Sequence, residues 1–275
     1  MNDQALNLPN VAVEKDGAVL LITINRPAAR NALTPEMLCR LADAFVMLRD
    51  DAALRVAVIT GSGDIAFCAG GDLGSTLPLL TGAREPADEW DRRVMNEPQV
   101  MAASSLRGFA LDKPVIAAIN GACLAAGFEL MLGTDIRIAA SHASFGLPEV
   151  QRGLIPFAGS MVRLPRQVPQ ALAMEIMLAG RPINAQRALQ VGLVNEVLPP
   201  EQVLPRAMAL AAQIAANGPL AVQQVKRTVM AASGASLEQG YAIEDDSRRT
   251  VFASADAQEG PRAFMEKRPP RFTGQ

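Results

Sequence analysis

The sequence predicts an α/β protein whose core repeats a unit of two strands and a helix. Short runs of β-branched and other apolar residues, typical of buried strands, cover residues 19–24, 56–60, 115–119 and 136–139. Helical patterns stand among them, at residues 34–49 and 125–132. This recurrence of strands and helices indicates an α/β core built by repetition.

The first helix has the clearest local signal. Thr34 offers a capping hydroxyl, Pro35 fits the first helical position, and Glu36 places an acid in the first turn. One apolar face then continues toward Arg49, through Met37, Leu38, Leu41, Phe45 and Leu48. The strand at 56–60 follows, and residues 61–72 are expected to form a loop.

Residues 73–112 are broken repeatedly by glycine and proline, so the pattern predicts little regular structure there. A long irregular stretch is either a lid or binding loop, or a mobile surface insertion, and the sequence leaves both open. Leu73, Trp90, Met95 and, further along, Leu147 are candidates to line an apolar site; the alternative is that they belong to the core.

Past residue 199 the pattern becomes helical throughout. Alanine-rich apolar stripes run through residues 201–217, 219–231, 237–253 and about 256–266. This tail is too thin for a core of its own, so it must pack on the main domain or on another subunit. We therefore divide the chain into a core, residues 1–199, and a helical C-terminal region, residues 200–275.

Composition narrows the class of protein. The 275 residues are 49% hydrophobic, which is enough for one large core, and the net charge of −2 argues against a protein that binds nucleic acid through phosphates. The three cysteines are odd in number and far apart, which favours a reducing compartment over a disulfide framework or a zinc site. Residues 1–4 lack the pattern of a signal peptide, and the longest apolar runs are too short for a bilayer. We expect a cytoplasmic protein without membrane or nucleic-acid partners.

Three frames rich in small and apolar residues carry acidic side chains: residues 67–72 (FCAGGD), 120–129 (NGACLAAGFE) and 144–149 (SFGLPE). Apolar surroundings can drive the pKa values of two acids such as Glu129 and Glu149 apart, so that one donates a proton while the other holds water. Small residues let backbone N–H groups approach a ligand. The combination predicts acid–base chemistry on a carbonyl compound. The plainer alternative pairs Glu129 with Arg137, and Glu149 with Arg152.

These frames, together with residues 25–27 (NRP), 31–33 (NAL), 153–159 (GLIPFAG) and 264–269 (FMEKRP), occur in an order that resembles the enoyl-CoA hydratase/isomerase (crotonase) family. The resemblance covers nearly the whole chain. It implies a crotonase-like spiral of repeated ββα units with a C-terminal helical trimerisation region. It also implies a homo-trimer or a hexamer made of two trimers. The substrate would be an acyl thioester of coenzyme A, with neither a metal nor a permanently bound cofactor.

The same resemblance implies the site residues. Glu129 and Glu149 match the two catalytic acids, with Glu149 exchanging the proton at Cα and Glu129 activating water. The backbone N–H groups of Gly71 and Ala126 match the donors to the thioester oxygen. The chain departs from the family where Gly71 replaces alanine, Ala126 replaces glycine and Phe157 replaces glycine. A positive φ at Ala126 would be strained, and Phe157 either narrows the acyl pocket or fills core.

Coenzyme A contacts are also implied. The segment containing Ala28, Ala29 and Arg30 resembles the stretch that holds the pantetheine and adenine, with Arg26 and Arg30 as phosphate partners. Ala69, Asp72 and Leu73 are expected along the ester, and Asp72 is also expected to cap the turn after Gly71. Lys267 and Arg268 would reach the cofactor of a neighbouring subunit. For each basic residue the alternative is a solvated surface charge.

The most specific expectation is an enoyl-CoA hydratase. The alternatives within the family are an isomerase, a dehydratase of a polar acyl group such as a carnitinyl thioester, and a non-catalytic member that binds CoA esters or RNA. Outside it, a Ser-His-Asp hydrolase is disfavoured because the one histidine, His142, follows no Gly-x-Ser-x-Gly elbow. A dinucleotide-dependent dehydrogenase lacks its Gly-x-Gly-x-x-Gly motif.

Overall fold

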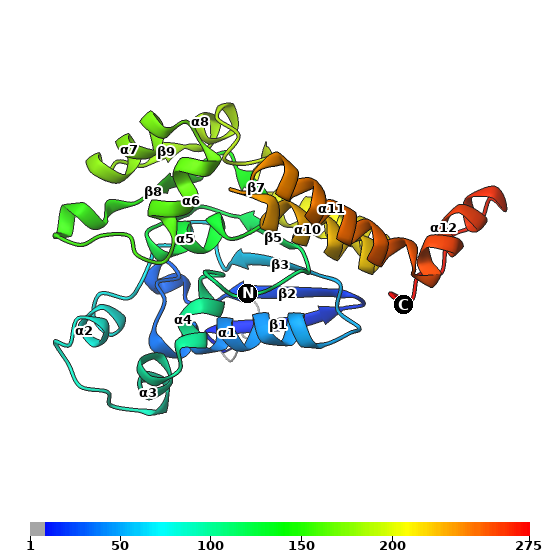
Figure 1. Cartoon of the computed structure of the whole chain (residues 1–275). Coiled ribbons are helices and arrows are strands. Elements are labelled where there is room, and N and C mark those ends of the chain that lie inside the picture. Colours follow the sequence, from blue (N-terminus) through cyan, green and yellow to red (C-terminus); the bar gives the residue numbers. More distant parts are fainter. Residues whose placement is uncertain (1–8) are drawn as a thin grey trace.

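The computed structural model of the chain describes residues 9–275 and shows two sheets with helices around them and a helical arm (Figure 1). The expectation about a leader at residues 1–4 lies outside the described residues. Every helix within residues 9–275 is too short or too polar to span a bilayer.

The larger sheet contains the predicted strands. Within residues 9–275 it has six strands in the order β1-β2-β3-β5-β7-β10. Their bounds are β1 Val11–Asp16, β2 Val19–Ile24, β3 Val56–Gly61, β5 Val115–Ile119, β7 Ile136–Ala140 and β10 Glu196–Leu198. β1 pairs antiparallel with β2, and the other neighbours are parallel. Every residue of β3 and of β5 is buried, which explains their continuous apolar sequences.

A smaller sheet runs beside the larger one. Its order among the described residues is β4-β6-β8-β9, with bounds Ala66–Cys68, Ala122–Leu124, Ser144–Gly146 and Ile183–Asn184. β4, β6 and β8 are parallel neighbours, and β9 is antiparallel to β8. β4 lies in residues 61–72, so the expectation of a loop throughout that stretch was wrong.

The two sheets arise from one repeated unit. The chain places β5 in the large sheet and β6 in the small sheet, and then forms α5 (Ala126–Leu132). It repeats the order with β7, β8 and then α6 (Ser160–Gln167), after a 3-10 turn, η3 (Pro148–Arg152). The predicted spiral of ββα units is confirmed.

The helix α1 (Pro35–Asp50) begins as predicted, because the Thr34 side chain accepts a hydrogen bond from the Met37 amide. The stretch 73–112, expected to be irregular, contains three helices: α2 (Thr76–Leu80), α3 (Glu89–Asn96) and α4 (Pro98–Ser104). Both α3 and α4 pack on α1. Neither the lid nor the mobile insertion therefore describes the whole stretch. The remaining short elements are η2 (Pro27–Ala29), α7 (Gln170–Ala179) and α8 (Ala185–Gln190).

The predicted C-terminal helices are present as α9 (Pro200–Ala215), α10 (Pro219–Ala232), α11 (Leu237–Phe252) and α12 (Ala255–Met265). α9 packs against β3, β5 and β7 and buries Val203, Ala207 and Ala211. Within the described chain α10 and α11 pack on each other and bury no residue of their own. They lead away from the sheets to α12, which lies at the far end of the arm (Figure 1).

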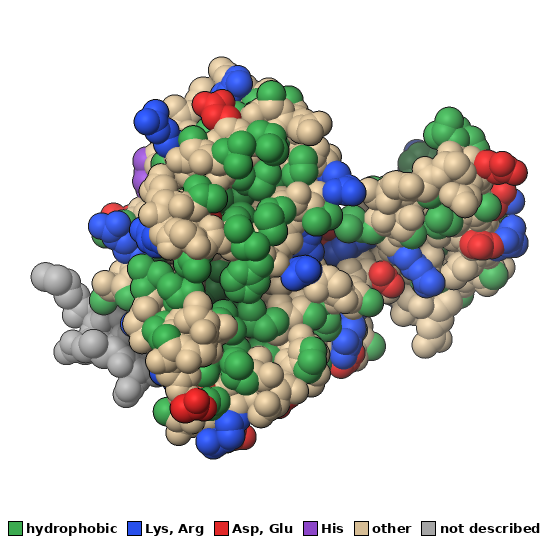
Figure 2. All heavy atoms as spheres, turned by 60° about the vertical axis from the view of Figure 1, so that its left-hand side comes forward, with side chains coloured by type: hydrophobic (Ala, Val, Ile, Leu, Met, Phe, Trp, Pro, Cys, Tyr) green, Lys and Arg blue, Asp and Glu red, His purple; other side chains and the backbone are tan. Residues whose placement is uncertain are grey.

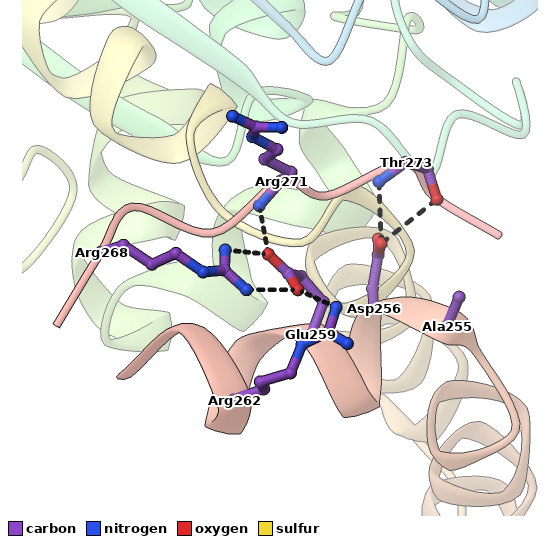
Figure 3. A pocket seen from close by; sticks show the side chains of 7 residues that line it. All are labelled: Ala255, Asp256, Glu259, Arg262, Arg268, Arg271 and Thr273. Carbon is purple, nitrogen blue, oxygen red and sulfur yellow. Dashed lines mark hydrogen bonds and ion pairs between the residues drawn. The ribbon is translucent and has the colours of Figure 1, made fainter. Parts of the chain in front are cut away.

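The last residues fold back onto α12 (Figure 3). Glu259 forms an ion pair with Arg268 at 2.6 Å and accepts a hydrogen bond from the Arg271 amide at 2.9 Å. Asp256 accepts hydrogen bonds from the amides of Thr273 and Gly274, both at 2.8 Å. A hollow of about 460 Å³ lies between α12 and the returning chain, and these paired groups line it. Because they bond to one another, we interpret them as holding the C-terminal segment on α12.

Candidate active site

The small sheet brings the three acidic frames together. β4 ends at Cys68, β6 at Leu124 and β8 at Gly146. Cys68 lies opposite Cys123, and Leu124 lies opposite Gly146. Since the carboxyl ends of parallel strands meet at one edge of a sheet, the residues that follow these strands share that edge. Gly71, Ala126 and Glu149 each come two or three residues after the end of one of these strands.

The turns that carry Gly71 and Ala126 lie against each other. A Cβ atom added to Gly70, whose φ is +109°, would lie 2.6 Å from the Cβ of Ala125 and 3.5 Å from the amide nitrogen of Ala126. Only glycine fits at such a close approach. Hydrogen bonds from Leu33 N to Gly70 O and from Asp72 N to Leu33 O, both 2.8 Å, hold the Gly71 peptide from its other side.

Both predicted amide donors are available. Within residues 9–275, neither the N–H of Gly71 nor that of Ala126 donates a hydrogen bond to a protein acceptor. Ala126 is the first residue of α5, where amides have no partner within the helix. Both residues are half-buried. Two unpaired N–H groups on adjacent turns can stabilise a negatively charged oxygen.

The positive φ of this turn lies one residue before Ala126. Ala126 is helical, and Ala125 has the positive φ, at φ +50° and ψ −128°. The condition under which Ala126 would be strained, a positive φ at that residue, is therefore not met. Ala125 is fixed in this conformation by a 2.9 Å hydrogen bond from its amide to the Gly146 carbonyl, and its Cβ contacts Gly70. A non-glycine residue in such a conformation is characteristic of functional sites.

Glu129 projects from α5 into a closed environment, with only 2% of its surface exposed. Its Oε1 accepts hydrogen bonds from the Ser160 hydroxyl at 2.8 Å and the Ser160 amide at 3.2 Å. Burial raises the pKa of Glu129, while the hydrogen bonds from Ser160 and from the Ala158 backbone, and the charge of Arg163, work in the opposite direction.

Glu149 has a contrasting environment in η3. Its Oε2 is buried and has no hydrogen-bond partner among residues 9–275. Burial is the largest cause that raises the pKa of Glu149, and the negative charge of Glu129 raises it further, to about 7. Glu149 therefore holds a proton at pH values where an ordinary glutamate has lost it.

The alternative ion pairs were wrong. Arg137 directs its guanidinium to the carbonyl oxygens of Leu132, Thr134 and Leu193. Arg152 donates to the Pro148 carbonyl at 3.3 Å. Neither arginine forms an ion pair with Glu129 or Glu149 among the described residues, although the charge of Arg152 works against the rise in the pKa of Glu149.

Several residues expected at coenzyme A lie beside the Gly71 turn. Ala28 and Ala29 belong to η2, Arg30 follows it with an exposed side chain, and the Arg30 carbonyl accepts a 3.1 Å hydrogen bond from the Ala69 amide. Leu73 is 58% exposed. The structure thus places this segment next to one of the two amide donors.

Arg26 and Asp72 contact each other. Arg26 Nη1 lies 2.5 Å from Asp72 Oδ2, so Arg26 is not an isolated surface charge. The other oxygen of Asp72 accepts from the amides of Gly74 and Ser75, which confirms Asp72 as a turn cap. Lys267 is exposed and follows the end of α12. In Figure 1, α12 lies far from the sheets of its own chain.

Hydrophobic side chains form a band across the face that Figure 2 turns forward. Large exposed apolar residues also stand after the Gly71 turn and in the segment that follows Glu149: Leu73, Ile155, Phe157 and Met161 are between 45% and 58% exposed. Leu147, in contrast, is fully buried in the core cluster, which supports the alternative that it belongs to the core. Trp90 is partly buried, with the guanidinium of Arg40 5.3 Å from its ring centre.

Sequence reasoning missed Ser160, Arg163 and Ala125. The quoted run 153–159 stops one residue before Ser160. A serine directly after a glycine-containing turn and before an amphipathic stretch was the available signal. Its pairing with Glu129, 31 positions earlier, depends on the fold.

Fold and site together combine two main-chain amides that have no protein acceptor within residues 9–275 with the buried Glu129 and the half-buried Glu149. This is an arrangement that can stabilise an oxyanion and transfer protons. The family model for enoyl-CoA hydratase/isomerase matches residues 14–275. The chain therefore belongs to the enoyl-CoA hydratase/isomerase family.

Individual relatives agree with this membership. The chain is 41% identical to enoyl-CoA hydratase EchA19 of Mycobacterium tuberculosis, over 96% of each chain. It is 40% identical to carnitinyl-CoA dehydratase of Proteus mirabilis, over 94% of this chain and 96% of the relative. The crystal structure of an enoyl-CoA hydratase from M. tuberculosis H37Rv matches with a TM-score of 0.85 at 41% identity, over 97% of this chain and all (100%) of that one.

Proposed function

We propose that this chain is an enoyl-CoA hydratase, a hydro-lyase that adds water reversibly across the 2,3 double bond of a 2-enoyl-CoA thioester. One observation carries the proposal: two carboxyl groups with different hydrogen bonding, Glu129 and Glu149, belong to the frames at one sheet edge where two amides have no protein acceptor within residues 9–275. Hydration needs these parts, since it moves two protons and builds negative charge on the thioester oxygen.

The amides of Gly71 and Ala126 donate hydrogen bonds to the thioester oxygen. Addition at Cβ makes this oxygen enolate-like, and fixed donors gain strength as the charge develops. A single donor of this kind is worth about 3–4 kcal/mol in the transition state. Because Ala126 opens α5, the positive end of that helix adds to the effect.

The two acids divide the proton transfers. Glu129, as a carboxylate, accepts a proton from water as the water oxygen bonds to Cβ. Glu149, as a carboxylic acid, gives its proton to Cα. After the product leaves, Glu129 loses its proton and Glu149 takes one up by exchange with solvent, which restores both groups for the next turnover. The hydrogen bonds at Glu129 and the lack of one at Glu149 Oε2 among residues 9–275 support this assignment. Such proton transfer contributes roughly 10²–10⁴-fold to rate.

The remaining site residues bind the coenzyme A portion. Ala28, Ala29, Arg30, Ala69 and Leu73 follow the thioester and pantetheine near Gly71. Arg26, steadied by Asp72, and Arg30 face the phosphates. Lys267 serves the site of a neighbouring subunit. The substrate is carried as a coenzyme A ester, and neither a metal nor a permanently bound cofactor takes part.

The chain works as a homo-trimer or as a dimer of trimers, in the cytoplasm. Residues 1–199 form the core that carries the site, and residues 200–275 form the oligomerisation region. Large exposed apolar residues on the helical arm support this division, among them Leu237, Phe252 and Phe264, which are 76%, 70% and 82% exposed.

The direct test follows the loss of ultraviolet absorbance of the enoyl thioester, with crotonyl-CoA and longer enoyl-CoAs. Glu129→Gln and Glu149→Gln should each lower kcat at least about 10²-fold while CoA-ester binding persists. Arg137→Lys, at a buried arginine that contacts neither glutamate, is a control for nonspecific damage. Full activity in both glutamine variants would refute the mechanism.

A second candidate is a dehydratase of a polar acyl-CoA, favoured by the 40% identity to a carnitinyl-CoA dehydratase. The same pair of acids would run elimination of water from the 3-hydroxy ester. Comparing kcat/KM for carnitinyl-CoA and for 3-hydroxybutyryl-CoA decides between the two substrates. An isomerase is less favoured because both acids are present.

A further inference from the structure

Ser160 is the first residue of α6, and its side chain is fully buried at 0% exposure. Within the described residues its hydroxyl makes one hydrogen bond, to Glu129 Oε1 at 2.8 Å. Its amide reaches the same oxygen at 3.2 Å. The side chain and the main chain of one residue thus fix a single carboxylate oxygen.

The helix itself needs only the amide. Glu129 Oε1 accepts from the N–H at the start of α6, and glycine or alanine would supply the same donor. α6 begins after Gly159, which has a φ of +122° and no side-chain cap. The hydroxyl is therefore surplus to helix capping, and its one partner in the described chain is the acid that we assign to the water.

We propose that Ser160 is a positioning residue for the hydration reaction: its hydroxyl aims Glu129 so that Oε2 faces the water and keeps the carboxyl group ionised. The inference rests on the proposed role of Glu129. With Oε1 held by two donors, rotation of the carboxylate about its last bond is restricted. A hydrogen bond to a carboxylate also favours its charged form.

The ionisable groups on the elements packed around Glu129 include Glu149, Arg163, Cys68 and Cys123. Glu149 in η3 raises the energy of its ionised form, and Arg163 in α6 lowers it. The thiols of Cys68 in β4 and Cys123 in β6, the strands packed on α5, stay neutral because burial raises their pKa values, that of Cys68 to about 12. Ser160 is then the side chain through which the Glu129 pKa can be changed without altering any charge.

The test compares Ser160→Ala, which removes only the hydroxyl, with Ser160→Thr, which retains it. Ser160→Ala should lower kcat about tenfold with KM changed less than about twofold, and should move the acidic limb of the pH–rate profile up by about one pH unit. Ser160→Thr should restore the limb. Ser104→Ala, at another buried serine that bonds only a backbone carbonyl, is the matched control.

A double-mutant cycle separates positioning from general structure. In the Glu129→Gln background, Ser160→Ala should change the residual rate less than about twofold, because the group it serves no longer ionises. An unshifted acidic limb in Ser160→Ala, or equal losses in both backgrounds, would overturn the inference. If Glu129→Gln is inactive and Ser160→Ala is normal, only the role of Ser160 fails. If Glu129→Gln keeps full activity, the assigned role of Glu129 fails and that of Ser160 fails with it, whereas loss of the enoyl absorbance still supports the proposed function.

Discussion

At the scale of single residues, Glu129 and Glu149 differ in the hydrogen bonds that reach their carboxyl groups. Glu129 is buried but receives donors from Ser160, whereas Glu149 has a buried oxygen without a partner in residues 9–275. The pair interacts, so its protons leave in two macroscopic steps. The donors favour ionisation of Glu129 first, which leaves one proton on the pair near neutral pH.

This shared proton predicts a bell-shaped dependence of kcat/KM on pH. Hydration starts with the proton on Glu149 and ends with it on Glu129, so both directions require the singly protonated pair. The pKa of Glu149 is about 7, and kcat/KM should therefore fall about tenfold per pH unit above that value. At low pH, protonation of Glu129 removes the base and activity falls again.

The profile should be the same for hydration and dehydration, because adding water to the thioester takes up no net proton and the equilibrium constant does not depend on pH. Initial rates with an enoyl-CoA and its 3-hydroxyacyl-CoA between pH 5 and pH 9 measure it. A rate that stays level up to pH 9 would show that Glu149 is ionised in the free enzyme and would contradict its role as acid.

At the scale of elements, the site depends on how closely α5 approaches β4. A Cβ atom on Gly127 would lie 2.6 Å from both the Cβ and the carbonyl oxygen of Cys68. Since β4 leads to Gly71 and α5 begins with Ala126, the contact at Gly127 sets the separation of the two amide donors. The position of the oxyanion site is thus a consequence of helix–sheet packing.

Gly127→Ala should therefore damage the enzyme in two ways. The added methyl group pushes α5 from β4, which we expect to cost about 1–3 kcal/mol in the free energy of unfolding. The displaced Ala126 amide should lower kcat more than tenfold, by about the loss of one oxyanion donor. Urea unfolding and the crotonyl-CoA assay give the two quantities.

Gly240→Ala provides a matched control, because Gly240 also lies in a helix, α11. Among residues 9–275, its added Cβ would meet only the Ala232 Cβ, at 3.7 Å. There the gain in helix propensity should stabilise the protein by up to about 1 kcal/mol. Equal effects of the two substitutions would show that close packing at α5 has no special importance.

Local sequence was sufficient for the elements whose burial is uniform or whose ends are capped. β5 is buried at every residue and α1 is capped by Thr34, so apolar runs and capping residues predicted both. β4, β6 and β8 have three residues each, too few for a periodic pattern, and their pairing depends on the large sheet beside them. β1 was missed because most of it is exposed.

Some features of the candidate site could likewise be predicted from local sequence, and others could not. Glu129, Glu149 and the small-residue turns were identified from motifs that the chain shares with a family. The positive φ of Ala125 and the hydrogen bond from Ser160 to Glu129 were not, since each depends on contacts between distant segments. A pKa near 7 for Glu149 likewise requires the burial that only the folded chain provides.

At the scale of the whole molecule, the helical arm exposes large apolar side chains that nothing in the described chain covers. Phe264 and Met265 on α12 are 82% and 79% exposed, and Tyr241 on α11 is 62% exposed. Isolated apolar residues are common on surfaces, but a concentration on an arm that extends from the body favours an interface. Because the family resemblance implies a trimer, we expect these residues to pack on a second copy of the chain.

Replacing Phe264 and Met265 together by serine should therefore shift the protein from trimer or hexamer toward monomer. The substitution removes apolar contact area from the expected interface, while the Glu259–Arg268 ion pair that fastens the tail is left intact. Size-exclusion chromatography with light scattering measures the mass. Met47→Ser, at a 40% exposed residue of α1, is the control and should leave the assembly unchanged.

The same variant connects assembly to function. If Lys267 contacts coenzyme A bound to a neighbouring subunit, dissociation should raise KM for the CoA ester more than it lowers kcat, because Glu129, Glu149 and both amide donors belong to one chain. Lys267→Ala in the intact assembly should reproduce the rise in KM alone. A wild-type protein that is monomeric and fully active would contradict both the trimer and the role of Lys267.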